Sequence, residues 1–212
     1  MGIISKGILG GFSGTVGNVV GGNWKGIDYM RSQSSKRTTA NTPAQLSQQA
    51  KFAVAIKFVR SMSGLLMISF RNNAIQMTGI NNALSYTLKN AITGVYPAYS
   101  IDYSTALVTR GDLPNVVSPT AVASAASIVT FNWTDNTGLG KAKATDKAML
   151  VVYCPSLNQS VYTTGSAARS AGTDAITASH FKGLAVETFI GFISDDGKDI
   201  TNSIYTGSVT VL

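Results

Sequence analysis

Apolar residues recur at two different spacings along the chain: every three to four positions before about residue 97, and every second position after about residue 99. The first spacing is that of an α-helix with one buried face, and the second is that of a strand in a sheet. The pattern therefore predicts an α+β chain, with a helical region over residues 42–96 and a β domain over residues 99–212.

The helical region begins with a clear start signal. Thr42 is a suitable N-cap, Pro43 stands at the first helical position, and Gln45 follows three residues after the cap. An apolar stripe then predicts one buried face of a helix that ends at about Met62: Leu46, Ala50, Ala53, Ile56 and Val59. Phe52 and Phe58 lie off this stripe, so more than one face of the helix is expected to be buried.

Two further helical segments are predicted. Gly64 interrupts the first pattern, and Leu65 to Arg71 reads as a short helix in preference to a strand. A third helix is indicated by apolar residues at every fourth position from Ile80 to Ile92, with Gly94 as its C-terminal stop. Pro97 ends the helical region.

Short alternating segments predict strands in the β domain, at residues 100–109, 127–133, 147–153, 160–163, 175–177, 185–193 and 203–211. Residues 135–138 and 195–198 have the composition of hairpin turns. Six or seven short strands in about a hundred residues are typical of an antiparallel, immunoglobulin-like β-sandwich. The cysteine pair of antibody domains is absent, so the prediction concerns architecture alone.

Residues 1–35 form a glycine-rich arm, with nine glycines between Gly2 and Gly26. We expect an irregular hairpin that turns at Gly21-Gly22-Asn23, because glycine permits close approach of backbones. The segment is too short and polar for a core of its own, so an arm that docks on a neighbouring subunit is predicted. The residues expected to make that interface are Phe12, Val16, Val19, Trp24, Tyr29 and Arg31.

The charge is uneven, with nine basic residues and one acidic residue in residues 1–71, and near neutrality in residues 113–212. Two interpretations stay open: solvated basic side chains, or an anionic partner such as nucleic acid or an acidic protein surface. Arm aromatics could stack on bases while Lys25, Lys36 and Arg37 meet phosphates. Only 13% of residues are charged, which favours surfaces that meet other protein.

Groups that transfer protons or bind metals are scarce. His180 is the single histidine, and three acidic residues precede Leu113. Gly138-Leu139-Gly140-Lys141 lacks the spacing and the hydroxyl residue of a phosphate-binding loop. Asp195, Asp196 and Asp199 are better explained by a hairpin turn than by calcium binding. We therefore expect no catalytic residue, no metal site and no cofactor, and the single cysteine, Cys154, is expected to be buried.

The amino terminus, MGIISKGILGGFSG, is a poor signal peptide, and no apolar run approaches the ~20 residues that span a bilayer. The expectation is a chain without a membrane span that is made in the cytoplasm and that can be carried in a virus particle.

The stretch Gly7 to Gly21 together with Trp24-Lys25-Gly26-Ile27-Asp28-Tyr29-Met30-Arg31 resembles the opening of an uncharacterised family from Bacteroidota and their phages. The likeness continues through the helix at residues 42–58, Lys89 to Gly94, Trp133 to Asn136, and Phe192 to Lys198. The resemblance implies a common architecture and brings no site residues with it. Its phage link implies a virion component.

The sequence as a whole favours a non-catalytic structural subunit that self-assembles into an ordered homo-oligomeric assembly, such as a phage virion or a filament. The alternative is a nucleic-acid-binding module that acts through the basic N-terminal half.

Overall fold

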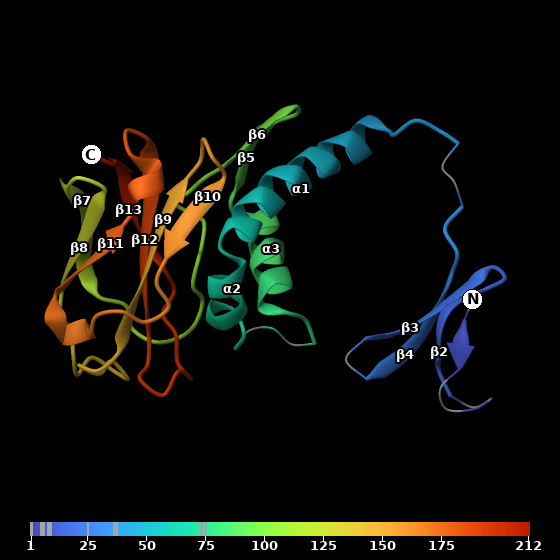
Figure 1. Cartoon of the computed structure of the whole chain (residues 1–212), viewed down its shortest axis with the longest axis horizontal. Helices are drawn as coiled ribbons and strands as arrows, with labels where there is room; N and C mark the ends of the chain where they lie inside the picture. Colours follow the sequence, from blue (N-terminus) through green and yellow to red (C-terminus); the bar gives the residue numbers. More distant parts are fainter. Residues whose placement is uncertain are drawn as a thin grey trace. The chain divides into compact units, whose positions relative to one another are not determined.

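The computed structural model describes residues 2–4, 7, 10–24, 26–35, 38–72, 74 and 76–212. The chain divides into two compact units, an arm (Met1–Thr42) and a body (Pro43–Leu212). Within the described residues there are three α-helices and four sheets, and every strand pair in these sheets is antiparallel (Figure 1). The predicted α+β class and antiparallel pairing are confirmed.

The arm is a four-stranded sheet with strand order β1-β2-β3-β4. Its strands are β1 (Ile3–Ile4), β2 (Phe12–Val16), β3 (Val19–Trp24) and β4 (Ile27–Ser32). The predicted turn at Gly21-Gly22-Asn23 is wrong, because these residues lie inside β3. The chain reverses instead at Gly17-Asn18, where Gly17 has a φ of 57°, and again between Trp24 and Ile27.

Gly21 and Gly22 leave space for the aromatic rings that lie over them. A Cβ atom on Gly21 would collide with the ring and the carbonyl oxygen of Phe12, and one on Gly22 would come within 2.8 Å of the Tyr29 hydroxyl. Each glycine thus makes room for an aromatic ring on a neighbouring strand, which is a packing role and not a turn role.

The first helix, α1 (Pro43–Ser61), begins at the predicted proline, and the predicted stripe is buried only at its C-terminal end. Ala55, Phe58 and Val59 are buried, whereas Leu46 and Ala53 from the predicted stripe are exposed. The reason is that only the last turns of α1 lie over the body core. Its first turns extend beyond that core, as Figure 1 shows.

The second helix, α2 (Ser63–Ser69), is confirmed as a helix and starts directly after α1 at a bend of 85°. Of the helices that the structure describes, none is by itself long and apolar enough to cross a bilayer, although α1 and α2 together pass that test of length and composition.

The third helix, α3 (Gly79–Asn90), is shorter than predicted. The Thr78 hydroxyl oxygen caps it by accepting a hydrogen bond from Asn81 N at 3.2 Å. Ile92 and Gly94, which were assigned to the helix, lie in β5 (Ile92–Val95), which pairs with β6 (Ala98–Ile101). Gly94 has a φ of 93°, and a side chain there would strike the backbone of Ala98, so this glycine serves a hairpin and not a helix end.

The other two sheets form the β part of the body. One has the order β10 (Gln159–Tyr162), β9 (Lys147–Cys154), β12 (Ala185–Ile193), β13 (Ile204–Thr210). The other has the order β11 (Thr173–Thr177), β8 (Ile128–Thr134), β7 (Val117–Ala125). Two short 3-10 helices, η1 (Arg169–Ala171) and η2 (Ser179–Phe181), flank β11.

Sequence reasoning misplaced two strands. The predicted strand at 100–109 is extended only to Ile101, and β7 was not predicted at all. The signal for β7 is weak because its inward residues are small, it contains Pro119, and its pairing with β8 shifts register twice. Bulges of this kind disturb the period of two on which a prediction depends.

The two predicted hairpin turns have different outcomes. Residues 195–198 do join antiparallel segments, since Ile193 bridges Ile200. Residues 135–138 do not form a hairpin, because β8 and the next strand, β9, belong to different sheets. This segment begins a crossover between sheets.

The sheet β10-β9-β12-β13 is covered on both faces. Met149, Val151 and Tyr153 of β9 pack with the helices in one core cluster, around Phe58 and Phe189. The alternate β9 residues, Ala148, Leu150, Val152 and the buried Cys154, pack with residues of the sheet β11-β8-β7 in a second cluster. One strand therefore supplies both cores, and the helices and strands of the body form a single unit.

A buried ion pair lies in the crossover region. Arg169 Nε donates to Asp146 Oδ2 at 3.1 Å, and both side chains are fully buried. The same guanidinium donates to Asn136 Oδ1 at 2.7 Å and to the Pro114 carbonyl at 3.0 Å, and it lies 4.7 Å from the centre of the Phe192 ring. Burial lowers the pKa of Arg169, and Asp146 opposes that shift.

Candidate functional site

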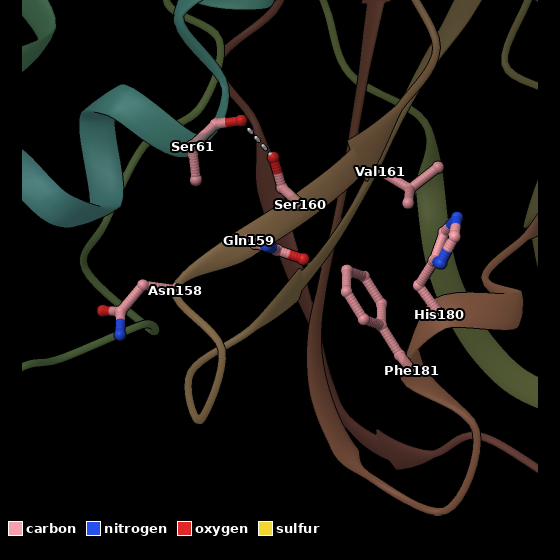
Figure 2. Close-up of a pocket in the computed structure, with 7 residues that line it drawn as sticks. All are labelled: Ser61, Asn158, Gln159, Ser160, Val161, His180 and Phe181. Atoms are coloured by element: carbon pink, nitrogen blue, oxygen red, sulfur yellow. Dashed lines mark hydrogen bonds between the residues drawn. The ribbon is translucent and has the colours of Figure 1, made fainter.

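The body has a hollow of about 190 Å³ beside β10 and η2, which Figure 2 shows with its seven lining residues. Its floor is held by a hydrogen bond from Ser160 Oγ to the Ser61 carbonyl at 2.8 Å. The single histidine, His180, is exposed at its rim beside Phe181. The lining residues include no carboxylate, so His180 has no acidic partner there to orient it for acid or base chemistry.

Metal-binding sets are also lacking in the part of the chain that is described, where no group of three His, Cys, Asp or Glu side chains lies close enough to hold an ion. Asp195, Asp196 and Asp199 lie on the turn after β12, where Asp196 accepts from the Ser194 hydroxyl at 2.6 Å. That hydrogen bond is the main reason that the pKa of Asp196 falls to about 2. These contacts are those of a turn.

The arm is the most unusual surface of the molecule. Both core clusters consist of body residues, and Gly21 is the one arm residue classed as buried among those described. Large apolar side chains of the arm are exposed instead, with exposed fractions of 51% for Trp24, 63% for Ile27 and 72% for Met30. A sheet of this size needs a covered apolar face to be stable.

Strand register divides the arm side chains between two faces, because directly paired residues share a face and neighbours along a strand alternate. Trp24 pairs with Ile27, and Gly22 pairs with Tyr29. The first face therefore carries Trp24, Ile27, Tyr29 and Arg31. The second carries Phe12, Val16, Val19 and Met30.

The six predicted interface residues are thus not one patch. Phe12, Val16 and Val19 lie on one face of the arm sheet, and Trp24, Tyr29 and Arg31 lie on the other. Lys25, Lys36 and Arg37, the predicted anion contacts, lie outside the described residues. Ile27 and Met30 are not among the predicted interface residues. Alternation from Ile27 to Tyr29 marks Ile27 as a strand side chain, whereas Met30 is out of phase with it and carries no such signal.

Local contacts fix the shape of the arm. The Tyr29 ring lies over Gly22 on the first face. On the second face, Asn23 Nδ2 donates to Asp28 Oδ1 at 2.7 Å across β3 and β4, and Gly26 N donates to Asn23 Oδ1 at 3.1 Å. The arm is therefore a regular sheet with two apolar faces, an arrangement suited to contact with other protein.

Comparison with known proteins gives one match. The model of a family of unknown function, DUF6266, matches residues 11–207. Neither the curated proteins nor the solved structures contain a significant match to the chain.

Proposed function

We propose that this chain, which belongs to the DUF6266 family of unknown function, is a non-catalytic structural subunit whose arm joins copies of the chain in an ordered assembly. The observation that carries the proposal is the arm sheet, which exposes large apolar side chains on both faces and contributes to neither core cluster. Covering these faces requires another surface, and a second copy of the chain supplies one.

The energetic argument rests on aromatic and aliphatic burial. A tryptophan ring buries roughly 150–250 Å² when it is covered, and such rings commonly anchor interfaces. Trp24 and Ile27 lie directly opposite each other on β3 and β4, so a single contact removes both from water. The arm thus presents a compact anchor on a short, regular sheet.

The proposal extends to the architecture and the setting of the protein. We infer that the sheets β10-β9-β12-β13 and β11-β8-β7 form an immunoglobulin-like sandwich, a view supported by the core cluster that their strands share. An assembly of such bodies linked by arms fits a phage virion or a filament, in a protein of Bacteroidota or of their phages.

Light scattering after size-exclusion chromatography, followed by negative-stain microscopy, tests the assembly. The wild-type chain is expected to form oligomers that grow with concentration, and Trp24→Ala is expected to weaken assembly by about 2 kcal/mol, or about thirtyfold in affinity. Because Trp24 is half exposed in the single chain, the melting temperature of the body should stay the same. A wild-type chain that is monomeric at every concentration would refute the proposal.

A second candidate is a nucleic-acid-binding module. It is supported by the stretch between Asp28 and Asp102, which contains eight basic residues and no acidic one. Binding to several phosphates weakens steeply as salt rises. A labelled single-stranded oligonucleotide that shows salt-sensitive binding near micromolar protein would favour this function, and absence of such binding would leave the basic charge to protein contacts.

A further inference from the structure

β4 forms a long, open edge of the arm sheet. In the part of the chain that is described, it pairs with β3 alone, over six consecutive residue pairs without a bulge. All six of its side chains are exposed. Its sequence, IDYMRS, contains neither proline nor lysine, which commonly protect an edge from pairing, and its two charged residues, Asp28 and Arg31, are of opposite sign. The opposite edge, β1, has only two residues.

The edges of the two larger body sheets have other elements of the body beside them. β7 lies beside β13, β11 lies beside β10, and β10 also contacts α1. β7 is further interrupted by Pro119 and by two register shifts. The outer strands of these two sheets are therefore each contacted by another element of the body, whereas the contact found beside β4 among the described residues, apart from β3, is that of Gly11 with Asp28.

The backbone groups of β4 point in known directions. In an antiparallel ladder, hydrogen-bonded residue pairs alternate with pairs that are not hydrogen-bonded. Gln33 N donates to the Asn18 carbonyl at 2.8 Å, so Gln33–Asn18 is a hydrogen-bonded pair and every second pair from it is one too. Tyr29 and Arg31 therefore exchange hydrogen bonds with β3. The N–H and C=O groups of Asp28, Met30 and Ser32 point away from β3, toward the open edge.

The side chains beside this edge lean inward. The Tyr29 ring lies over Gly22, and Asp28 accepts a hydrogen bond from Asn23, so both side chains are directed toward β3. The Asp28 side chain also lies against Gly11, so the chain before β2 contacts this end of β4. An incoming strand would pair with the outward donors and acceptors of Met30 and Ser32.

We propose that β4 pairs with β4 of a second copy, antiparallel and about a twofold axis, with Met30 opposite Met30 of the second copy. This inference rests on the proposed function and specifies its contact. In this register Arg31 lies opposite Tyr29 of the second copy and Asp28 lies opposite Ser32, so no two like charges face each other. The two arms then form one eight-stranded sheet.

A second copy fits this edge because the strand is complementary to itself. The antiparallel register keeps the two Arg31 side chains apart and the two Asp28 side chains apart. A parallel, in-register arrangement would place each of them against its like charge, which is unfavourable. The Trp24 and Ile27 strip of each copy also lies on the same face of the joined sheet, so the two strips make a larger apolar surface.

A cysteine placed on the twofold axis tests the register. Opposed Cα atoms of a hydrogen-bonded pair lie about 5.5 Å apart, and their Cβ atoms are farther apart than a disulfide prefers, so a short thiol-reactive crosslinker is used. Met30→Cys treated with a short bismaleimide is expected to give a covalent dimer as the main species on a denaturing gel. The native Cys154 is buried and provides no competing thiol.

Val16→Cys is the matched control. Val16 is exposed to 55%, lies on the same face as Met30, and is two strands inside the edge. Across the joined sheet it lies about five strand spacings, roughly 24 Å, from its counterpart, so it should stay uncrosslinked. Failure of Met30→Cys to crosslink, or equal crosslinking of Val16→Cys, would overturn the inference.

Light scattering of the wild-type chain distinguishes a failure of the proposed edge pairing from a failure of the proposed function. If wild type is oligomeric and Met30→Cys does not crosslink, the edge pairing is wrong and the proposed function stands. If wild type is monomeric at every concentration, the proposed function itself is wrong.

A proline at the same position gives a second, independent test. Met30→Pro removes an N–H that points to the open edge and leaves the hydrogen bonds between β3 and β4 in place. We expect it to abolish the dimer, while Met30→Thr, which keeps the N–H, retains it. A Met30→Pro chain that dimerises like wild type would show that the edge is not used.

Discussion

At the scale of single residues, the burial of Arg169 is a feature that the local sequence does not predict. Nothing in the local sequence distinguishes Arg169 from a solvated arginine, yet it is the largest fully buried side chain among those described. Its partners are Asp146, Asn136 and Pro114, and they come from separate segments of the crossover region and the loop before β7. Only the fold brings them together, so no spacing rule could have identified the site.

We predict that Arg169→Met lowers the free energy of unfolding by about 3–5 kcal/mol, because it leaves the Asp146 carboxylate buried without its cation. Asp146 Oδ1 already has no hydrogen-bond partner among the described residues, so the remaining charge would be poorly compensated. Urea denaturation followed by circular dichroism measures the loss. Lys198→Met is the control, since it removes an exposed ion pair and should change stability by less than about 0.5 kcal/mol. A change of the same small size for Arg169→Met would contradict the prediction.

Three tyrosines of the first core cluster should make the body sensitive to alkali. Burial, followed by the charge of Glu187, raises the pKa of Tyr103 to about 12. Burial also raises the pKa of Tyr153 and Tyr205, and the Tyr205 hydroxyl donates to Glu187 Oε2 at 2.5 Å. Between the ordinary pKa of 10.0 and the raised values, the folded chain binds more protons than the unfolded chain. The contribution of these tyrosines to the free energy of unfolding is therefore fully present below pH 10, and it is lost as pH rises toward 12.

Denaturation in urea at a series of alkaline pH values tests whether the free energy of unfolding falls with rising pH. Tyr205→Phe should reduce the slope of the fall, because one of the raised groups is gone. Tyr96→Phe, which alters an exposed side chain at the β5–β6 hairpin, is the matched control. Stability that is independent of pH up to 12 would rule the explanation out.

At the scale of elements, the sequence predicts strands and helices well where one periodic signal dominates. β12 and β9 were placed to within a residue because long apolar runs bounded by turn residues mark them. The buried face of α1 was misjudged because its apolar stripe continues through turns that lie beyond the body core. β7 was missed because small residues and bulges weaken its alternation. Periodicity reports which face is apolar, and it does not report whether anything covers that face.

The arm illustrates the same limit for the candidate site. The glycines and aromatic residues of the arm predict a contact region, with a turn at Gly21-Gly22-Asn23. In the structure these glycines accommodate rings, and the six proposed contact residues divide between two faces. Register decides both points, and register depends on pairing between strands that a local pattern does not specify.

Gly21→Val should open the arm sheet. A side chain at this position collides with the Phe12 ring and the β2 backbone, and overpacking of this kind costs about 1–3 kcal/mol, which is large for a small sheet. Amide hydrogen exchange over residues 12–32 is expected to quicken, and assembly is expected to fail. Thr15→Val, on the opposite face of the same strand pair, should leave exchange unchanged. Normal protection in Gly21→Val would show that the arm tolerates a side chain there.

At the scale of the whole molecule, the proposed assembly assigns stability and association to different units. Residues 43–212 contain every member of both core clusters, whereas residues 1–42 hold the exposed apolar sheet. The melting behaviour should therefore belong to the body and the oligomeric state to the arm. In the proposed assembly, the apolar surface that the arm exposes is covered by another copy of the chain.

The most direct measurement is sedimentation velocity of the full chain beside a chain that begins at Pro43, across the same range of concentrations. The account predicts that the full chain forms oligomers in a concentration-dependent way, and that the shorter chain stays monomeric and melts at the same temperature. Oligomers of equal size from both chains would place the contact in the body, and a full chain that stays monomeric throughout would contradict the account.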